Sequence, residues 1–194
     1  MSSTQSVNVT YSPAPQGRFN SVAIGLHWVL ALALVAVFGV GLYMNGLPFS
    51  PQKLKLINWH KWAGITILLL SVLRLLWRWT HRPPPLSPRA EAAMPGWQRW
   101  AHHAVQGLMY VLFLAVPLLG WAYSSAAGFP IVWFGVMPLP DLLPVDKALA
   151  DAIKPWHGWA AFTLAALVVV HVAAVVKHQL IDRDGLMSRM WPGR

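Results

Sequence analysis

Residues 156–178 of the chain read WHGWAAFTLAALVVVHVAAVVKH, an almost uninterrupted apolar stretch that carries His157 near its start and His171 further along. The two histidines are fourteen residues apart. In an α-helix of about 100° per residue, this separation returns to within about 40° of the starting direction and covers about 21 Å of the helix axis. The stretch therefore predicts a helix that presents two imidazoles from one face at two different depths.

The composition around this stretch is that of a membrane protein. The chain has 194 residues, of which 56% are hydrophobic and 11% are charged, whereas about a quarter of the residues of a soluble domain are charged. Crossing about 30 Å of hydrocarbon takes about 20 apolar residues. Four runs reach that length, near 21–44, 57–80, 99–123 and 156–180. We therefore predict an all-α integral membrane four-helix bundle with up-down-up-down connections.

Two segments lie outside the predicted spans. Residues 1–17 are polar and lack apolar periodicity, so we expect a disordered tail there and one transmembrane domain over 18–194. The connection 124–155 is long for a bundle, and its aromatic centre is expected to lie on the membrane surface. Its last part, 146–154, is expected to form a short amphipathic helix before the fourth span. Pro51 is expected to keep the first loop irregular.

The lysines and arginines indicate which way the bundle faces. One side, with both termini and the loop between the second and third spans, holds nine of them. These are Arg18, Arg78, Arg82, Arg89, Arg99, Lys177, Arg183, Arg189 and Arg194. The opposite side holds five, namely Lys53, Lys55, Lys61, Lys147 and Lys154. Because cytoplasmic loops carry the excess of positive charge, both termini are expected in the cytoplasm.

Several classes of protein are excluded by composition. The chain has no cysteine, which excludes disulfides, iron-sulfur clusters, thiol catalysis and haem attached through cysteine. Its formal net charge is +9, but the basic residues stand at the ends of spans and form no stripe on a nucleic-acid-binding motif. Nucleic acid is therefore not an expected partner, and the lipid bilayer is.

The four spans supply each histidine of the fourth span with a partner at the same depth. His60 opens the second span on the outer side, where His157 opens the fourth. His27 lies in the cytoplasmic half of the first span, at the level of His171. Four-helix bundles commonly hold cofactors between facing side chains. We therefore expect two sites, one between His60 and His157 and one between His27 and His171.

Two histidines per site suit the two axial positions of haem iron. A structural zinc site takes four ligands, and the chain has no Cys and no Asp or Glu in the spans to add to two histidines. The same absence of Asp and Glu excludes a di-iron carboxylate centre. A haem with both axial positions filled carries single electrons. Arg74 lies fourteen residues after His60, on the same helical face. Because an arginine inside an apolar span is costly unless it meets an anion, we expect Arg74 to contact the propionates of the inner haem.

Other interpretations of these residues remain open. A single histidine in a membrane span often serves only as a hydrogen-bonding residue between helices, and a haem-free transporter or structural protein would use its histidines in that way. His81, His102 and His103 are interpreted as solvated side chains near a basic loop. Lys53, Lys55 and Lys61 either contact lipid headgroups or attract a small anion toward His60.

Several short motifs resemble the bacterial cytochrome b561 family of di-haem membrane proteins over residues 18–192. They are Leu26-His27-Trp28, His60 followed by Arg74-Leu75-Leu76, Tyr110 with Pro117 and Gly120, Trp156-His157 with His171, and the ending Leu186-Met187-Ser188-Arg189-Met190-Trp191-Pro192. The resemblance implies two haems b bound by these four histidines, a place in the bacterial inner membrane and ubiquinone as an electron acceptor. It also matches His178 to a histidine near the quinone site. The chain departs from the family where Gln106 replaces a frequent second histidine on the third span.

Some members of this family are similar to superoxide oxidases, which pass an electron from periplasmic superoxide through the haems to quinone. The resemblance therefore implies a superoxide:ubiquinone oxidoreductase, with Lys53, Lys55 and Lys61 as an anion entrance beside His60. The alternative is a cytochrome b subunit that relays electrons between a partner dehydrogenase or hydrogenase and the quinone pool.

Overall fold

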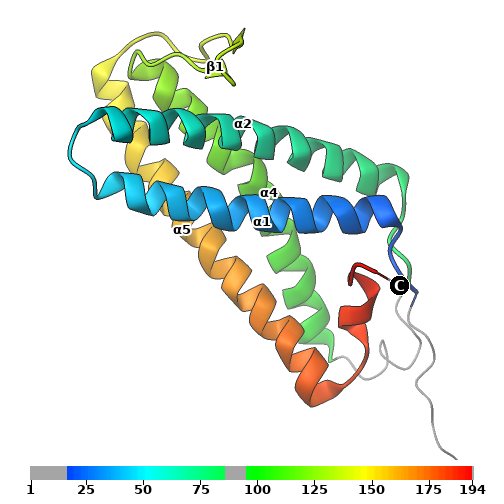
Figure 1. Cartoon of the computed structure of the whole chain (residues 1–194). Coiled ribbons are helices and arrows are strands. Elements are labelled where there is room, and N and C mark those ends of the chain that lie inside the picture. The colour runs from blue at the N-terminus through cyan, green and yellow to red at the C-terminus, as the bar shows by residue number, and fades with distance from the viewer. Residues whose placement is uncertain (1–16, 86–94, 194) are drawn as a thin grey trace, which may run out of the picture.

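The computed structural model of the chain describes residues 17–85 and 95–193 and is predominantly helical. Its four long helices are α1 (Ser21–Asn45), α2 (Pro51–Thr80), α4 (Gly96–Ala126) and α5 (Lys147–Lys177), shown in Figure 1. Each is long and apolar enough to cross a membrane. The four expected spans are thus helices. The expected disordered tail lies, apart from Gly17, outside the described residues.

Polar side chains at the helix starts explain where three of the helices begin. Asn20, Ser50 and Asp146 each accept a hydrogen bond from a backbone N–H in the first turn of the helix that follows, which is the usual role of an N-cap residue. The expectation that Pro51 keeps the first loop irregular is wrong. Pro51 is the first residue of α2, where its missing N–H would have no partner in the helix.

The start of α5 also differs from expectation. Residues 146–154 do not form a separate amphipathic helix, because Asp146 is the N-cap of α5 and α5 is continuous from Lys147 to Lys177 with Pro155 inside it. Proline removes one backbone hydrogen bond, and the helix continues through that loss. As a result α5 extends beyond the predicted span, and the connection from α4 shortens to residues 127–146.

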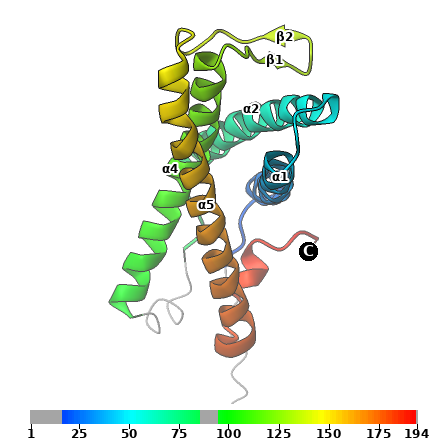
Figure 2. The ribbon, with the colours of Figure 1, turned by 90° about the vertical axis from the view of Figure 1, so that its left-hand side faces the viewer.

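The helices form two hairpins that cross obliquely. α1 packs against α2 and α4 packs against α5, while α2 also contacts α4 (Figures 1 and 2). Consecutive helices run in opposite directions along the ribbon. We call the end with the α1–α2 connection, 46–50, and the α4–α5 connection, 127–146, the loop end. The opposite end, where α1 begins and α5 finishes, is the terminal end.

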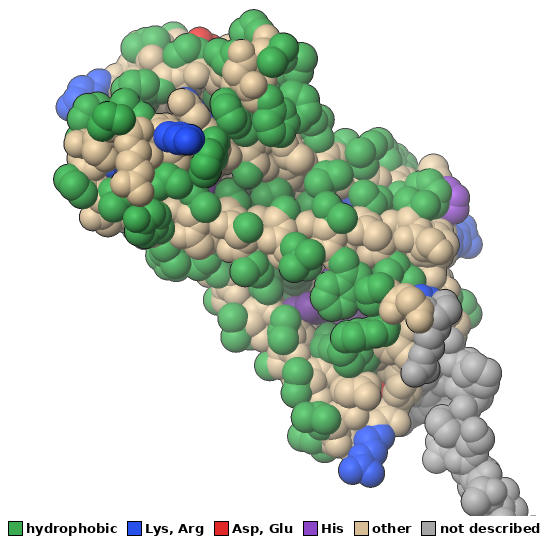
Figure 3. Space-filling model, viewed as in Figure 1, with side chains coloured by type: hydrophobic (Ala, Val, Ile, Leu, Met, Phe, Trp, Pro, Cys, Tyr) green, Lys and Arg blue, Asp and Glu red, His purple; other side chains and the backbone are tan. Residues whose placement is uncertain are grey.

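The interior is small and apolar, and the exterior of the helices is apolar as well. Leu112 and Phe113 of α4 and Leu164 of α5 form the buried core, and Leu34 of α1 packs against them. Many large apolar side chains on the outward faces are exposed, and Figure 3 shows them across the middle of the molecule with lysine and arginine side chains toward its ends. This distribution is the one expected of a surface that faces lipid.

A short hairpin covers part of the loop end. Strand β1 (Val132–Trp133) pairs antiparallel with β2 (Met137–Pro138) across a turn in which Phe134 and Gly135 have positive φ. Trp62 of α2 donates a hydrogen bond of 2.6 Å to the carbonyl of Val132. The aromatic centre of the connection is therefore tied to α2, where the sequence predicted only a position on the membrane surface.

The C-terminal segment returns to the start of the chain. After a π-helical turn, η1 (His178–Asp182), the chain reverses at Arg183 and Gly185 and forms the 3-10 helix η2 (Leu186–Arg189). The side chain of Arg189 is 8% exposed and donates to the carbonyls of Gly17 and Pro84. We call residues 186–191 the C-terminal clasp, because they join the start of α1 to the segment that follows α2.

Candidate functional site

At the loop end, His60 of α2 faces His157 of α5. The centres of their rings are 6.2 Å apart, and the ring planes are nearly perpendicular at 85°. The Nδ1 atom of His157 lies 2.9 Å from the carbonyl oxygen of Val116 on α4. A backbone acceptor at this nitrogen orients the ring and leaves Nε2 available as a ligand atom. The buried Nδ1 of His60 makes no hydrogen bond of ordinary geometry within the described part of the chain, although the backbone of Val37 on α1 interacts with this ring.

Two glycines without side chains allow these two histidine rings to lie close to the backbones of α4 and α1. A Cβ atom on Gly120 of α4 would lie 3.0 Å from Cε1 of His157, and one on Gly41 of α1 would lie 3.2 Å from Cε1 of His60. Both distances are shorter than ordinary van der Waals contact. All four helices therefore take part at the loop end, two with a histidine and two with a glycine.

At the terminal end, His27 of α1 faces His171 of α5. The ring centres are 6.4 Å apart and the planes meet at 68°. Both rings are partly buried. The structure thus brings together the same two pairs of histidines that the sequence predicts, each pair joining α5 to a different helix.

An apolar layer separates the two pairs. Leu164 is seven residues from His157 and seven from His171, and it packs with Leu34 and Phe113 in the buried core. The helical rise between His157 and His171 is about 21 Å. The two histidine pairs are therefore distinct sites at two levels of one bundle.

The same spacing of fourteen residues recurs on every long helix. It joins a residue near the loop end to one near the terminal end on one helical face. The pairs are His27 with Gly41, His60 with Arg74, Gln106 with Gly120, and His157 with His171. The sequence reasoning did not find the part played by Gly41. The repeated spacing is the signal that could have found it.

Arg74 lies at the terminal end, as its spacing from His60 predicts. It is half-buried, and its Nε donates a hydrogen bond of 3.4 Å to the hydroxyl of Tyr110 on α4. No carboxylate partner of Arg74 occurs in the portion of the chain that the structure describes.

The three lysines near His60 each have a local partner. Lys53 donates to the carbonyl of Leu47 at 2.6 Å, and the ammonium of Lys55 lies 5.0 Å from the ring centre of Trp59. Lys61 is half-buried and donates to the Ser124 hydroxyl and to the carbonyls of Phe129 and Pro130. Lys61 therefore anchors the connection between α4 and α5, whereas Lys53 contacts the α1–α2 connection and Lys55 is exposed.

His178 lies in a network of charged side chains just beyond α5. Its Nδ1 is 2.6 Å from a carboxylate oxygen of Asp184 and 3.1 Å from one of Asp182. The ligand atoms of these three residues lie within 4.8 Å of one another, a spacing that could hold a metal ion. Because the ammonium of Lys177 already contacts Asp182 at 2.6 Å, we interpret the group as an ion-pair network that orients the His178 ring.

Four apolar helices with two pairs of facing histidines define a membrane protein that can hold metal-centred groups between its helices. Over residues 18–193 the chain matches the family described as prokaryotic cytochrome b561, and it belongs to that family. The family binds haem b and transfers electrons in membranes. These comparisons support an oxidoreductase in a bacterial membrane.

Relatives of known name cover almost the whole chain. Cytochrome b561 homolog 2 of Escherichia coli K12 is 30% identical over 183 residues, which are 94% of this chain and 95% of the relative. Cytochrome b561 homolog 1 of the same organism is 30% identical over 182 residues, with shares of 91% and 98%. The probable superoxide oxidase CybB of Yersinia pestis is 28% identical over 179 residues, with shares of 90% and 96%.

Proposed function

We propose that the chain binds two haem b groups, one between His60 and His157 and one between His27 and His171. The observation that carries this proposal is the spacing of the rings. With metal–nitrogen bonds of about 2 Å and a ring centre about 1.2 Å behind each nitrogen, two imidazoles on opposite sides of one metal have centres about 6.4 Å apart. The pairs in this chain measure 6.2 and 6.4 Å.

The surroundings of the loop-end pair support the same assignment. The Val116 carbonyl fixes the side of the His157 ring that faces away from the site, and Gly120 allows the ring to lie against α4. When bound, haem b supplies one-electron oxidation and reduction at its iron.

The protein is proposed to exclude water from between the two haem sites and to supply a positive charge beside one of them. Leu34, Phe113 and Leu164 exclude water from the space between the two levels. Arg74 is proposed to meet the propionates of the terminal-end haem, because its guanidinium has only the Tyr110 hydroxyl as a hydrogen-bond partner in the described chain. A haem held by two imidazoles in each site would be suited to electron transfer.

We place the terminal end in the cytoplasm and the loop end in the periplasm of a bacterial inner membrane. The excess of lysine and arginine at the terminal end supports this orientation. Ubiquinone is proposed to accept electrons at the terminal end, near His178. The Nδ1 of that ring is engaged by Asp184 and Asp182, which leaves Nε2 as the atom that can bond a quinone oxygen.

Superoxide is the donor that we favour. Two superoxide anions each lose one electron and become dioxygen, and ubiquinone takes up the two electrons with two protons to become ubiquinol. The relative from Yersinia pestis named as a probable superoxide oxidase supports this choice. Lys53, Lys55 and Lys61 at the loop end are proposed to draw the anion toward His60, with Lys61 acting mainly through its charge because its hydrogen bonds are taken by the loop.

A second candidate function is that of a cytochrome subunit reduced by a partner redox protein. The observation in its favour is the apolar surface of the β1–β2 hairpin, where Val136 is 84% exposed and Phe134 is 58% exposed. Such a patch is a feature of surfaces that contact another protein or the membrane.

Quinol formation by the purified protein distinguishes the two functions. The haem-loaded protein is mixed with a steady source of superoxide and with ubiquinone, and ubiquinol is measured against the His157→Ala variant. We expect superoxide-dependent ubiquinol only with the unaltered chain. A rate no higher than the spontaneous one would exclude superoxide as the donor and favour the partner-dependent function.

A further inference from the structure

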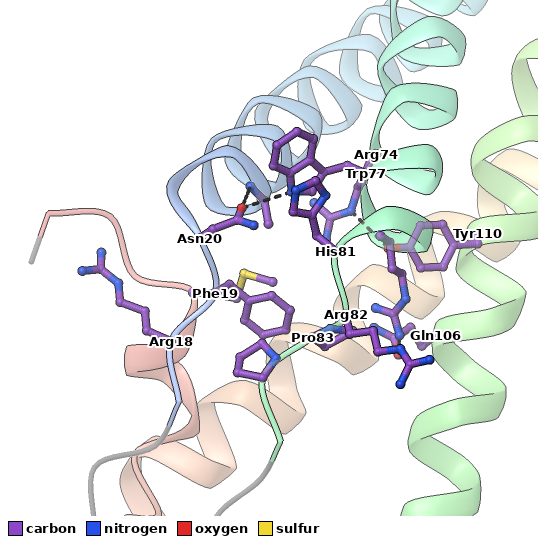
Figure 4. A pocket seen from close by; sticks show the side chains of 14 residues that line it. Arg18, Phe19, Asn20, Arg74, Trp77, His81, Arg82, Pro83, Gln106 and Tyr110 are labelled. Carbon is purple, nitrogen blue, oxygen red and sulfur yellow. Dashed lines mark hydrogen bonds between the residues drawn. The ribbon is translucent and has the colours of Figure 1, made fainter.

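A basic cavity opens at the terminal end, between the start of α1, the end of α2 and the middle of α4. Its volume is about 240 Å³. Four arginines line it, namely Arg18, Arg74, Arg78 and Arg82. Figure 4 shows the lining side chains and labels Arg18, Arg74 and Arg82. None of the described lining residues is a carboxylate. The cavity is separate from His178, which is not part of its lining.

The arginines of the cavity have neutral partners. Arg78 donates to the side-chain oxygen of Gln106 at 3.2 Å, and its guanidinium carbon lies 5.6 Å from the ring centre of Tyr110. Arg18 donates to the carbonyl of Trp191 at 2.8 Å. Within the described residues, no ion pair involves an arginine of this cavity. Each guanidinium has five N–H donors, so most of the donors around the cavity are available to a ligand.

Positive charges gathered in this way repel one another unless an anion lies among them. Arg74 and Arg78 are four residues apart on α2 and share a face, and Arg82 follows just after the helix ends. Arg74 is the deepest of the three along the helix. Arg78 and Arg82 are therefore available to bind a second anion. This anion would lie nearer the membrane surface than the haem propionates that we assign to Arg74.

We propose that this cavity binds a phosphate group, with Arg78 and Arg82 as its main contacts. The planar, forked guanidinium matches phosphate oxygens in pairs, and such charge-assisted hydrogen bonds are the strong ones. The start of α1 also borders the cavity, through its N-cap Asn20 and through Ala23 of the first turn, and this places the positive end of the helix dipole nearby. The source of the phosphate is an anionic phospholipid headgroup or free phosphate.

The position of the cavity and its apolar wall fit a lipid headgroup. Arg82 follows directly after α2, where a membrane-crossing helix reaches the level of the lipid phosphates. Trp77 and His81 stack with ring centres 3.9 Å apart, and with Phe19 they give the cavity an aromatic side. An aromatic wall beside cationic donors suits a ligand with both an apolar and an anionic part. This inference is independent of the electron donor and of the quinone.

Lipid retention by the haem-loaded protein tests the proposal. The protein is reconstituted with phosphatidylglycerol or with phosphatidylcholine, stripped of loosely held lipid, and weighed by native mass spectrometry to count the lipids that stay bound. A third arm adds inorganic phosphate to the lipid-free protein and measures its binding. The variants are Arg78→Gln with Arg82→Gln, and the matched control is Arg99→Gln with Arg183→Gln. The control removes the same charge from the same end of the molecule, at arginines that do not line the cavity.

We expect the unaltered chain and the control to retain phosphatidylglycerol and to bind it in preference to phosphatidylcholine. The double cavity variant should lose about a hundredfold in affinity, equivalent to about 2.8 kcal/mol, because the charge-assisted hydrogen bonds from Arg78 and Arg82 to the phosphate are removed. Binding of inorganic phosphate without retained lipid would identify free phosphate as the ligand.

Equal retention of phosphatidylglycerol by the cavity variant and the control, with no difference in phosphate binding, would overturn the proposal. So would a cavity variant that loses haem while its lipid and phosphate binding stay unchanged, because the arginines would then serve only the propionates. If the double variant fails to fold, Arg82→Gln alone provides the test. Its side chain is exposed and lies beyond the helix, so its loss should leave the fold intact.

Discussion

At the scale of single residues, the loop-end site depends on atoms that the sequence does not mark as functional. The Val116 carbonyl accepts from His157, and Gly120 lets the His157 ring approach the backbone of α4. Gly41 does the same for His60 on α1. The histidines were predictable because their spacing follows from helix geometry. The Val116 carbonyl was not predictable, because its position depends on how far apart two helices pack. The same spacing could have placed the glycines on the correct helical face, but not the close approach of the rings to them.

Gly120→Ala should weaken the loop-end haem site selectively. The added methyl would lie 3.0 Å from Cε1 of His157 and 3.2 Å from its Nδ1, so either the ring or α4 must move. We expect a lower ratio of haem to protein, with the loss confined to one of two spectral components. The matched control is Gly107→Ala on the same helix, where nothing lies within 4 Å of the new methyl. Equal haem content in the two variants would show that the close approach is unimportant.

At the scale of elements, the length of the apolar runs in the sequence predicted the four long helices. It did not predict the structure of the connections between them. Runs of about 20 apolar residues are visible in the sequence. The contacts of the C-terminal clasp join residues more than 100 positions apart, such as Arg189 with Gly17 and Pro84. The β1–β2 hairpin has strands of two residues. No periodic pattern indicates contacts of this kind.

Lys61→Ala should loosen the connection between α4 and α5 more than Lys55→Ala does. The ammonium of Lys61 supplies hydrogen bonds to the Phe129 and Pro130 carbonyls, which lose this partner when the side chain is removed. The expected loss is about 1–3 kcal/mol. Hydrogen exchange over residues 127–146 measures it. Indistinguishable exchange in the two variants would mean that Lys61 does not anchor the loop.

Arg189→Ala should release the C-terminal clasp. The guanidinium donates to the Gly17 and Pro84 carbonyls and lies 5.4 Å from the ring of Phe19. Because these hydrogen bonds involve a charged group in a buried position, their loss should cost about 2–3 kcal/mol. Limited proteolysis of the segment after α5 reports the release, with Arg183→Ala as the exposed control. An unchanged rate of cleavage in Arg189→Ala would contradict the role of the clasp.

At the scale of the whole molecule, the two proposed haem sites would form a path for electrons between the two sides of a membrane. α5 carries one histidine of each pair, and the buried core around Leu164 lies between them. The pairing of His60 with His157 and of His27 with His171 was predictable because alternating helix directions place those residues at matching depths. The oblique crossing of the two hairpins was not, because it depends on side-chain packing between helices (Figure 2).

Both termini are predicted to lie in the cytoplasm. A fluorescent protein fused after Arg194 should therefore fold and fluoresce, and alkaline phosphatase fused at the same position should be inactive. The reason is the larger number of lysines and arginines at the terminal end. Active phosphatase at this position would reverse the proposed direction of electron flow.

The central claim is that each chain holds two haem b groups at two separate histidine pairs. Haem per polypeptide, measured by pyridine haemochrome on the purified protein and on His157→Ala and His171→Ala, tests it most directly. We predict two haems for the unaltered chain and one for each variant, with a different spectral component lost in each. A single haem in the unaltered chain, or the loss of the same component in both folded variants, would contradict the account.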